Sequence, residues 1–219
     1  MYSPDMCKEA ICKVGKRMYE KGLVVANDGN ISWRISENEV LMSPSGVCKA
    51  DMTPDMILKT DIEGNILEGT NKPSSELIMH LRVYKTLPER KAVIHAHPAF
   101  ATAFAVANIP LDKIIYPTAY SFLGYVPVTK YATSTTTDLA DAVEDSIRNG
   151  EKAILLANHG VLTSAATLWD AYFLLERLES YATISYLAKQ LGGGRELSGE
   201  EKVELEAKIV RQKNSGMMY

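Results

Sequence analysis

The sequence is poor in cysteine and histidine, and it lacks long apolar runs. Its three cysteines, Cys7, Cys12 and Cys48, are odd in number and have no Cys-x-x-Cys spacing. They are typical of reduced structural thiols in a reducing compartment. No apolar run is long enough to span a membrane, and the N-terminus lacks the basic and apolar regions of a signal peptide. We therefore expect a cytoplasmic protein without a membrane partner.

Clusters of basic residues interleaved with aromatic residues are also missing. With a net charge of −3, the chain is not expected to bind nucleic acid. The composition, 46% hydrophobic and 23% charged among 219 residues, is ordinary for a folded domain with a substantial core. We expect a single domain over residues 1–219, with a mobile tail from about residue 214.

Helix caps and turn residues punctuate the chain. Residues 31–43 are expected to form a β-hairpin, whereas residues 109–131 are expected to hold only short strands and loops. Since a hairpin excludes a purely parallel sheet, the alternation of strands and helices predicts one α/β domain. The expected helices run from Ser3-Pro4 to Gly22, at Thr53-Pro54, from Ser74 onward, over residues 99–107, from Thr137 to Gly150, over residues 167–190, and from Ser198 to about Lys213.

Two histidines, His95 and His97, follow a short apolar run in the segment KAVIHAHPAF. Residues 92–94 are typical of a buried strand, and Pro98 ends it. Side chains on a strand alternate between its two faces, so both imidazoles are expected on the same side. Two imidazoles on one face are half of a zinc site, which needs three or four ligands.

A third histidine, His159, follows a second apolar run in the segment AILLANHGVLT. A single His-x-His pair is more often two polar residues with ordinary hydrogen bonds at the end of a strand. Three histidines at the ends of two strands are much less easily explained by chance. We therefore predict a site for zinc, or for another divalent ion that prefers imidazole.

Three polar turns have the composition of an anion site. They offer backbone N–H groups, hydroxyl groups and a helix N-terminus, all of which attract negative charge. Each turn taken alone is ordinary turn or cap material, and no lysine or Walker sequence accompanies the three. A phosphate site follows only if the fold brings them together. The turns are Gly29-Asn30, Ser45-Gly46 and Ser74-Ser75.

Glu76 and His80 lie four residues apart at the start of one expected helix. For Glu76 the simple interpretation is a favourable interaction with the helix dipole. The functional interpretation is a carboxylate beside the metal, as general base or ligand. For His80 we favour a partly buried residue that supports the helix, because it belongs to neither strand end.

The motifs DGNIS, SPSG, PSSE, HAHP and NHG occur in that order, and through them the chain resembles the class II aldolase/adducin family. The resemblance covers nearly the whole chain up to the long helix after Leu162. It implies a three-layer α/β/α sandwich around a mostly antiparallel sheet. It also implies a C4 homotetramer with active sites between subunits, and a small sugar phosphate as substrate.

The resemblance also implies residue roles. His95, His97 and His159 would bind zinc, and Glu76 would be the acid/base that approaches the metal. The proton-donating tyrosine would come from a neighbouring subunit; the landmark Tyr131-Ala132-Thr133 favours Tyr116, with Tyr120 and Tyr125 as alternatives. The residues that would hold the substrate phosphate are Gly29, Asn30, Ser45, Gly46, Ser74 and Ser75.

The implied activity is reversible cleavage of a ketose 1-phosphate, of the L-fuculose 1-phosphate kind. The products would be dihydroxyacetone phosphate and an aldehyde, formed through a metal-stabilised enediolate. Rhamnulose, deoxyribulose and methylthioribulose 1-phosphates stay open as substrates, and no role transfers to the C-terminus.

Three alternatives remain, two of them enzymes and one a non-catalytic scaffold domain. A ribulose 5-phosphate 4-epimerase of the family typically has Asp where this chain has Glu76, and Thr where it has Ala96. A methylthioribulose-phosphate dehydratase fits the HAHP and PSSE motifs less well. Adducin-like scaffold domains have lost metal ligands, whereas this chain keeps three histidines and Glu76. These differences favour an aldolase.

Overall fold

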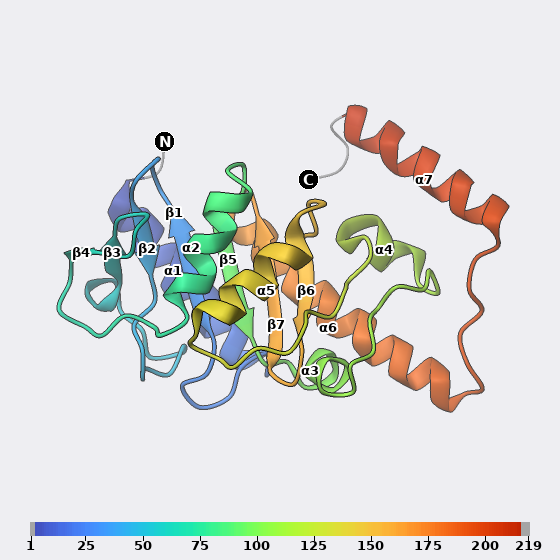
Figure 1. The fold of residues 1–219 in the computed structure, drawn as a ribbon, viewed down its shortest axis with the longest axis horizontal. Helices are drawn as coiled ribbons and strands as arrows, with labels where there is room; N and C mark the ends of the chain where they lie inside the picture. The colour runs from blue at the N-terminus through green and yellow to red at the C-terminus, as the bar shows by residue number, and fades with distance from the viewer. Residues whose placement is uncertain (1–2, 216–219) are drawn as a thin grey trace.

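One antiparallel sheet forms the middle layer of the computed structural model, which describes residues 3–215 (Figure 1). Its strand order within the described residues is β4-β3-β2-β1-β5-β7-β6, and every pair of neighbouring strands is antiparallel. The strands are β1 (Asn30–Arg34), β2 (Val40–Met42), β3 (Leu58–Thr60), β4 (Ile66–Glu68), β5 (Ala92–Ala96), β6 (Ala153–Leu156) and β7 (Gly160–Ala165).

Helices cover both faces of this sheet and extend beyond it. Helix α7 lies apart from the sheet and packs against α4 (Figure 1). The helices are α1 (Pro4–Glu20), a short 3-10 helix η1 (Pro54–Met56), α2 (Leu77–Thr86), α3 (Ala99–Val106), α4 (Pro117–Leu123), α5 (Thr137–Ile147), α6 (Leu168–Gln190) and α7 (Gly199–Asn214).

Two apolar clusters, one on each face of the sheet, make the core. Helices α1, α3 and α6 pack on the face that carries Ile31 and Ile94. Helices α2 and α5 pack on the opposite face, which carries Val93 and Leu162. Because neighbouring residues of β5 face opposite layers, the strand is buried along its whole length, as its run of apolar residues predicted. The predicted three-layer α/β/α sandwich with an antiparallel sheet is confirmed.

Three of the helix caps that the sequence predicted are present, whereas α2 and α5 begin without a side-chain cap. Ser3 accepts a hydrogen bond from the backbone N–H of Met6 at the start of α1, and Thr167 accepts one from Asp170 at the start of α6. At α7 the hydroxyl of Ser198 accepts from the backbone N–H of Glu201, whose carboxylate accepts from the N–H of Ser198. This reciprocal pair is a capping box.

Two expectations about local structure are wrong. The segment 109–131 contains helix α4, which Pro117 starts at the first helical position and Gly124 ends. Helix α2 begins at Leu77, not at Ser74, because Ser74 to Glu76 form a turn in which the carbonyl of Ser74 accepts from the N–H of Leu77. His159 follows the end of β6, as expected, and because β7 begins at the next residue it lies in a hairpin turn.

The extent of the domain and its mobile tail stay predictions. Helix α7 continues to Asn214, and residues 216–219 of the expected tail lie outside the described residues. Among the helices that the structure describes, none combines the length and the apolar character needed to cross a membrane.

Candidate metal centre

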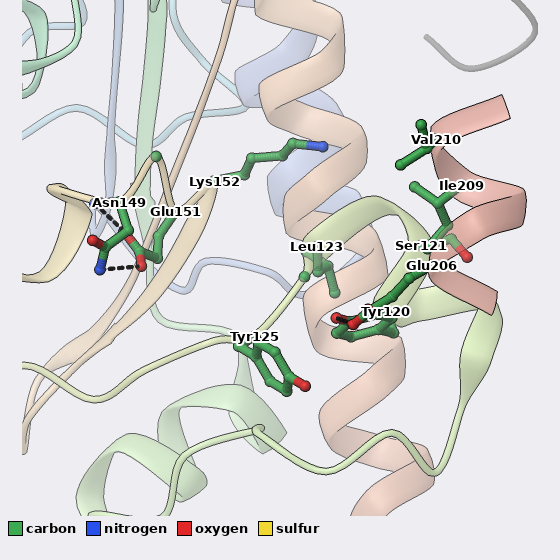
Figure 2. Close-up of a pocket in the computed structure, with 12 residues that line it drawn as sticks. Tyr120, Ser121, Leu123, Tyr125, Asn149, Glu151, Lys152, Glu206, Ile209 and Val210 are labelled. Atoms are coloured by element: carbon green, nitrogen blue, oxygen red, sulfur yellow. Dashed lines mark hydrogen bonds between the residues drawn. The ribbon is translucent and has the colours of Figure 1, made fainter. Parts of the chain in front are cut away.

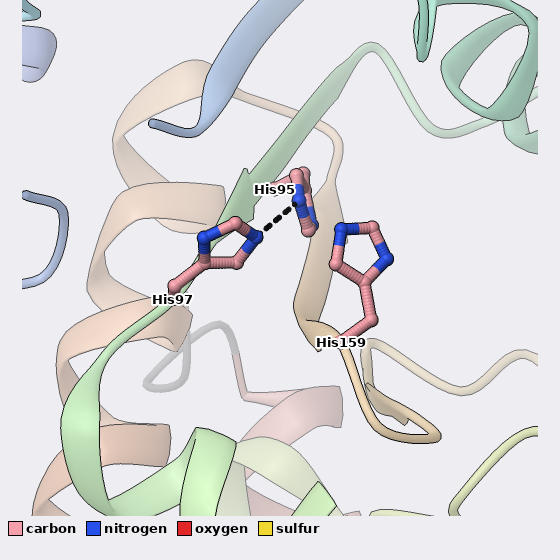
Figure 3. A group of neighbouring side chains, drawn as sticks. All are labelled: His95, His97 and His159. Carbon is pink, nitrogen blue, oxygen red and sulfur yellow. Dashed lines mark hydrogen bonds between the residues drawn. The ribbon is translucent and has the colours of Figure 1, made fainter. Parts of the chain in front are cut away.

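The sheet brings the three histidines together. His95 lies in β5, and His97 follows the end of that strand. His159 lies in the turn between β6 and β7, and β7 pairs with β5 so that Val161 is opposite Ala96. Three potential ligand atoms, one from each of these histidines, lie within 4.8 Å of one another (Figure 3).

Two glycines allow this close approach. A Cβ at Gly160 would lie 2.6 Å from the carbonyl oxygen of Ala96 and would also collide with the ring of His97. Gly29 has a φ of +73°, and a Cβ there would lie 2.9 Å from the carbonyl oxygen of His95. Any side chain at either position would push against β5 and displace the histidines that this strand carries at its end.

Hydrogen bonds at Nδ1 set the direction of two imidazoles. Nδ1 of His95 lies 2.9 Å from the carbonyl oxygen of Val161, and Nδ1 of His97 lies 3.3 Å from Oδ2 of Asp28. Since these oxygens only accept, Nδ1 is the donor in each pair, and Nε2 is the ring nitrogen left to face the site. Ligating histidines are typically oriented in this way by a second hydrogen bond.

The two Nε2 atoms of His95 and His97 are only 2.9 Å apart. Burial lowers the pKa of His95 well below its usual value, and the charges of His97 and His159 act in the same direction, so the ring is neutral. Two imidazole nitrogens this close together, on rings whose Nδ1 atoms are turned to other partners, suit a cation shared between them. The donor set therefore fits a divalent metal that prefers imidazole.

Glu76 closes the site on the side of α2. Its Oε2 accepts a hydrogen bond from the amide of Asn30 at 2.8 Å and lies 3.3 Å from Nε2 of His95. Its Oε1 lies 3.2 Å from Nε2 of His159. The side chain is 11% exposed, so one carboxylate faces two of the imidazoles in a largely desolvated position. It can hold a proton or share the metal.

His80 lies behind Glu76 and outside the group of three. It is fully buried, and its Nδ1 lies 2.7 Å from the hydroxyl of Ser32, which in turn lies 2.7 Å from the hydroxyl of Tyr84. Burial lowers the pKa of His80 to about 3, with a smaller contribution from His95. The residue is completely buried instead of partly buried, and its role in supporting the helix stays a prediction.

The three polar turns lie side by side next to Glu76. Ser43, which precedes the Ser45-Gly46 turn, accepts from the N–H of Ile31 and donates its own N–H to the Ile31 carbonyl. The N–H of Ser45 donates to the carbonyl of Lys72 at 2.9 Å, and Pro44 forms a bridge with Pro73. Gly46 has open space around it, and Ser45, Gly46 and Ser75 are exposed. The fold thus brings together Gly29-Asn30, Ser45-Gly46 and Ser74-Ser75.

The three candidate tyrosines belong to another part of the molecule. Tyr116 precedes α4, and its ring lies 6.4 Å from that of Tyr181 in α6. Tyr120 donates to Glu206 of α7 and lies 5.1 Å from the ring of Tyr125. Both line a cleft of about 440 Å³ between α4 and α7 (Figure 2). None of the contacts recorded for these tyrosines in the described chain involves a histidine.

Two residues beside the site carry no prediction from the sequence. Asp28 contacts His97, and Lys49 is a buried lysine whose ammonium group binds the backbone of the turn before Asp28. The sequence signal for Asp28 was present but weak, because Asp-Gly is common in turns. Nothing in the sequence predicted the burial of Lys49, since a lysine between Cys48 and Ala50 is expected at the surface.

Known proteins resemble the chain over most of its length. Residues 9–186 match the Class II Aldolase and Adducin N-terminal domain family. The chain is 35% identical to the 3-oxo-tetronate 4-phosphate decarboxylase of Haemophilus influenzae, over 82% of this chain and 86% of that protein. It is 33% identical to the 5-deoxy-D-ribulose 1-phosphate aldolase of Bacillus thuringiensis, over 92% and 94% respectively. A solved structure of an L-fuculose 1-phosphate aldolase superposes with a TM-score of 0.88 and 35% identity, covering 97% of this chain and 98% of its own.

Proposed function

The chain belongs to the class II aldolase and adducin N-terminal domain family, and we propose that it reversibly cleaves a ketose 1-phosphate into dihydroxyacetone phosphate and an aldehyde. The family and its aldolase and decarboxylase relatives make the chain a metal-dependent class II lyase that acts on a small sugar phosphate. One observation carries the proposal. Three imidazoles converge beside a single carboxylate, Glu76, next to three turns suited to an anion.

His95, His97 and His159 are the proposed ligands of a zinc ion. Neutral ligands leave the ion its full charge, so when bound it supplies Lewis acidity that stabilises the negative charge developed on the three-carbon fragment. Asp28 and the Val161 carbonyl would keep two of these rings oriented for binding the ion.

Proton transfer is assigned to Glu76 and a tyrosine. In the cleavage direction, the tyrosine takes the proton of the hydroxyl that becomes the aldehyde, and the carbon–carbon bond breaks. Glu76 then gives a proton to the carbon that leaves with the three-carbon unit, and condensation reverses both transfers. The amide of Asn30, at 2.8 Å, holds the Glu76 carboxylate in place for this transfer.

The substrate phosphate is assigned to the three turns. Backbone N–H groups and hydroxyls at Gly29-Asn30, Ser45-Gly46 and Ser74-Ser75 anchor the three-carbon end, and exposure of Ser45, Gly46 and Ser75 supports this. Binding energy from the phosphate then orients the carbonyl end at the metal, while the aldehyde half varies more freely.

Assembly and location complete the proposal. We propose a homotetramer with active sites at subunit interfaces, since Tyr116, Tyr120 and Tyr125 contact other residues than the three histidines within the described part of the chain. A cytoplasmic location stays a prediction.

A decarboxylase relative supports a second candidate activity. A 3-oxo-tetronate 4-phosphate is a β-keto acid, and its loss of carbon dioxide leaves the same three-carbon carbanion beside a carbonyl. The same histidines, Glu76 and phosphate site would serve both reactions. Decarboxylation forms no aldehyde and so needs no base to remove a hydroxyl proton. Loss of activity on removal of the tyrosine hydroxyl is therefore expected for the aldolase and not for the decarboxylase.

The test is a substrate panel on purified protein, with and without a chelator. The panel holds fuculose, rhamnulose, 5-deoxyribulose and methylthioribulose 1-phosphates, a 3-oxo-tetronate 4-phosphate and ribulose 5-phosphate. We expect chelator-sensitive release of dihydroxyacetone phosphate from one of the ketose 1-phosphates, restored by zinc. Carbon dioxide release or 4-epimerisation as the only activity would replace the aldolase assignment with the corresponding one.

A further inference from the structure

Lys49 is a buried lysine without an acidic partner. Its side chain is 1% exposed, and its ammonium group donates to the backbone carbonyl oxygens of Asn27, at 3.1 Å, and Val47, at 2.8 Å. Among the described residues, no carboxylate forms an ion pair with it. Burial lowers the pKa of Lys49, and the nearby charges of Cys48 and Asp28 oppose this effect only in part.

The burial of this lysine is built into the packing. Helix α1 passes so close that a Cβ at Gly15 would lie 2.9 Å from the carbonyl oxygen of Lys49 and 3.4 Å from its Cβ. Lysine ordinarily keeps its ammonium group in water, because removing a charge from water is costly. Two carbonyl oxygens satisfy hydrogen bonds but do not neutralise the charge. The charge is therefore available to an anion bound nearby.

The two carbonyls belong to two of the three polar turns. Asn27 is two residues before Gly29, and Val47 directly follows Gly46. A single ammonium group thus ties the Gly29-Asn30 turn to the Ser45-Gly46 turn. The third turn joins them through the hydrogen bond between Ser45 and Lys72.

We propose that Lys49 is a positioning and specificity residue for a phosphate monoester dianion. It fixes the distance between the two turns, and its unneutralised charge favours a phosphorylated ligand over the neutral sugar. The inference rests on the proposed function in placing phosphate at these turns, and it supplies the cation that the sequence motifs lacked.

The experiment compares Lys49→Met with the wild type and with Lys59→Met, and all three proteins are loaded with zinc. Lys59 is a useful control because it is 20% exposed and paired with Glu39 and Glu68 on β3. The first readout is the dissociation constant of inorganic phosphate by calorimetry. The second is the KM of dihydroxyacetone phosphate in condensation, compared with that of unphosphorylated dihydroxyacetone.

For Lys49→Met we expect at least tenfold weaker binding of phosphate and a matching rise in KM for the phosphorylated substrate. The kcat, the zinc content and the KM of dihydroxyacetone should change less than threefold. Lys49→Arg should recover part of the phosphate affinity, and Lys59→Met should match the wild type. A folded Lys49→Met protein that binds phosphate within twofold of the wild type overturns the proposal, as does equal weakening for both ketones.

A measurement on the unaltered protein covers the case in which Lys49→Met does not fold. Lysine labelled with 13C at Cε reports the titration of each ammonium group by NMR, and the resonance lost in Lys49→Arg identifies the site. Phosphate binding should move the Lys49 titration to higher pH, and an unmoved titration at saturating phosphate contradicts the inference. Phosphate binding needs no turnover. Absence of cleavage of every ketose phosphate would therefore contradict the proposed function without affecting the result for Lys49.

Discussion

A carboxylate oxygen of Asp28 lies 3.3 Å from Nδ1 of His97, on the side of the ring opposite to the other histidines. Asp28 reaches this position because it directly precedes Gly29, whose positive φ turns the chain toward β5. The turn that is proposed to hold phosphate therefore also holds a proposed metal ligand. Metal and phosphate sites therefore share one short piece of backbone.

Replacing Asp28 by alanine should weaken metal binding. Loss of the hydrogen bond at Nδ1 frees the His97 ring and lowers the basicity of Nε2, and such changes cost about 10–100-fold in metal affinity. Competition with a chromophoric chelator measures this constant. Asp28→Asn, which keeps an oxygen acceptor, should lose less, and Asp51→Ala at an exposed site is the control. Unchanged metal affinity in Asp28→Ala would show that the contact does not orient the ligand.

Glu76→Gln should keep the metal and lose turnover. Glutamine fills the same space, but it cannot carry a proton between the substrate carbon and the site, and general acid–base groups contribute about 10²–10⁴-fold to rate. Zinc content by mass spectrometry and single-turnover cleavage separate binding from chemistry. Glu68→Gln, on the exposed strand β4, is the matched control. Full turnover in Glu76→Gln would assign the base elsewhere.

Local signals predicted the ligands of this site but not its surroundings. The period of two on β5 placed His95 and His97 correctly, because it depends only on backbone geometry. Joining them to His159 required the β6–β7 hairpin, which the sequence signals did not reveal because residues 153–165 read as one apolar run broken by Asn-His-Gly. The roles of Asp28 and Lys49 were not predicted, because the contacts of Asp28 with His97 and of Lys49 with Asn27 span 69 and 22 positions. Local composition does not indicate contacts between residues so far apart.

The helix over residues 117–123 shows a different limit. Pro117 and Gly124 are ordinary start and stop signals, yet the segment between them is short and rich in aromatic residues, which favour strands. Packing against α6 and α7 decides in favour of a helix. Intrinsic preference is weak over so few residues, and tertiary contacts override it.

The buried imidazole of His80 should make the metal-free protein sensitive to acid. Its pKa is lowered to about 3 in the folded chain, so between pH 6.5 and about 3 the unfolded chain binds more protons. The free energy of unfolding is therefore unaffected by this group above pH 6.5. It falls as the pH decreases below that value, by up to about 5 kcal/mol for this group. Urea unfolding at several pH values measures the slope.

His80→Gln tests the origin of that slope. Glutamine can keep a hydrogen bond to Ser32 but does not titrate, so stability should fall less steeply below pH 6.5 than in the wild type. The slope is reduced and not abolished, because burial also lowers the pKa of His95. An identical slope in both proteins would assign the acid sensitivity to other groups. Tyr84→Phe, which removes only the far hydroxyl of the same chain of hydrogen bonds, should retain the wild-type slope.

Tyr116→Phe should slow aldol cleavage by about 10²–10⁴-fold while leaving metal content unchanged, because phenylalanine keeps the ring that packs near Tyr181. Tyr120→Phe and Tyr125→Phe are the matched variants, and the one of the three variants that loses cleavage activity identifies the proton donor.

Subunit mixing then tests whether that hydroxyl acts in its own subunit or in a neighbouring one. If each site takes its histidines from one chain and its tyrosine from the next, mixed assemblies of Tyr116→Phe and His97→Ala chains contain some complete sites. Two inactive proteins would then regain activity on co-refolding. No recovery, with mixed assemblies present by native mass spectrometry, would require the tyrosine and the histidines of one chain to meet, and would contradict a site shared between subunits.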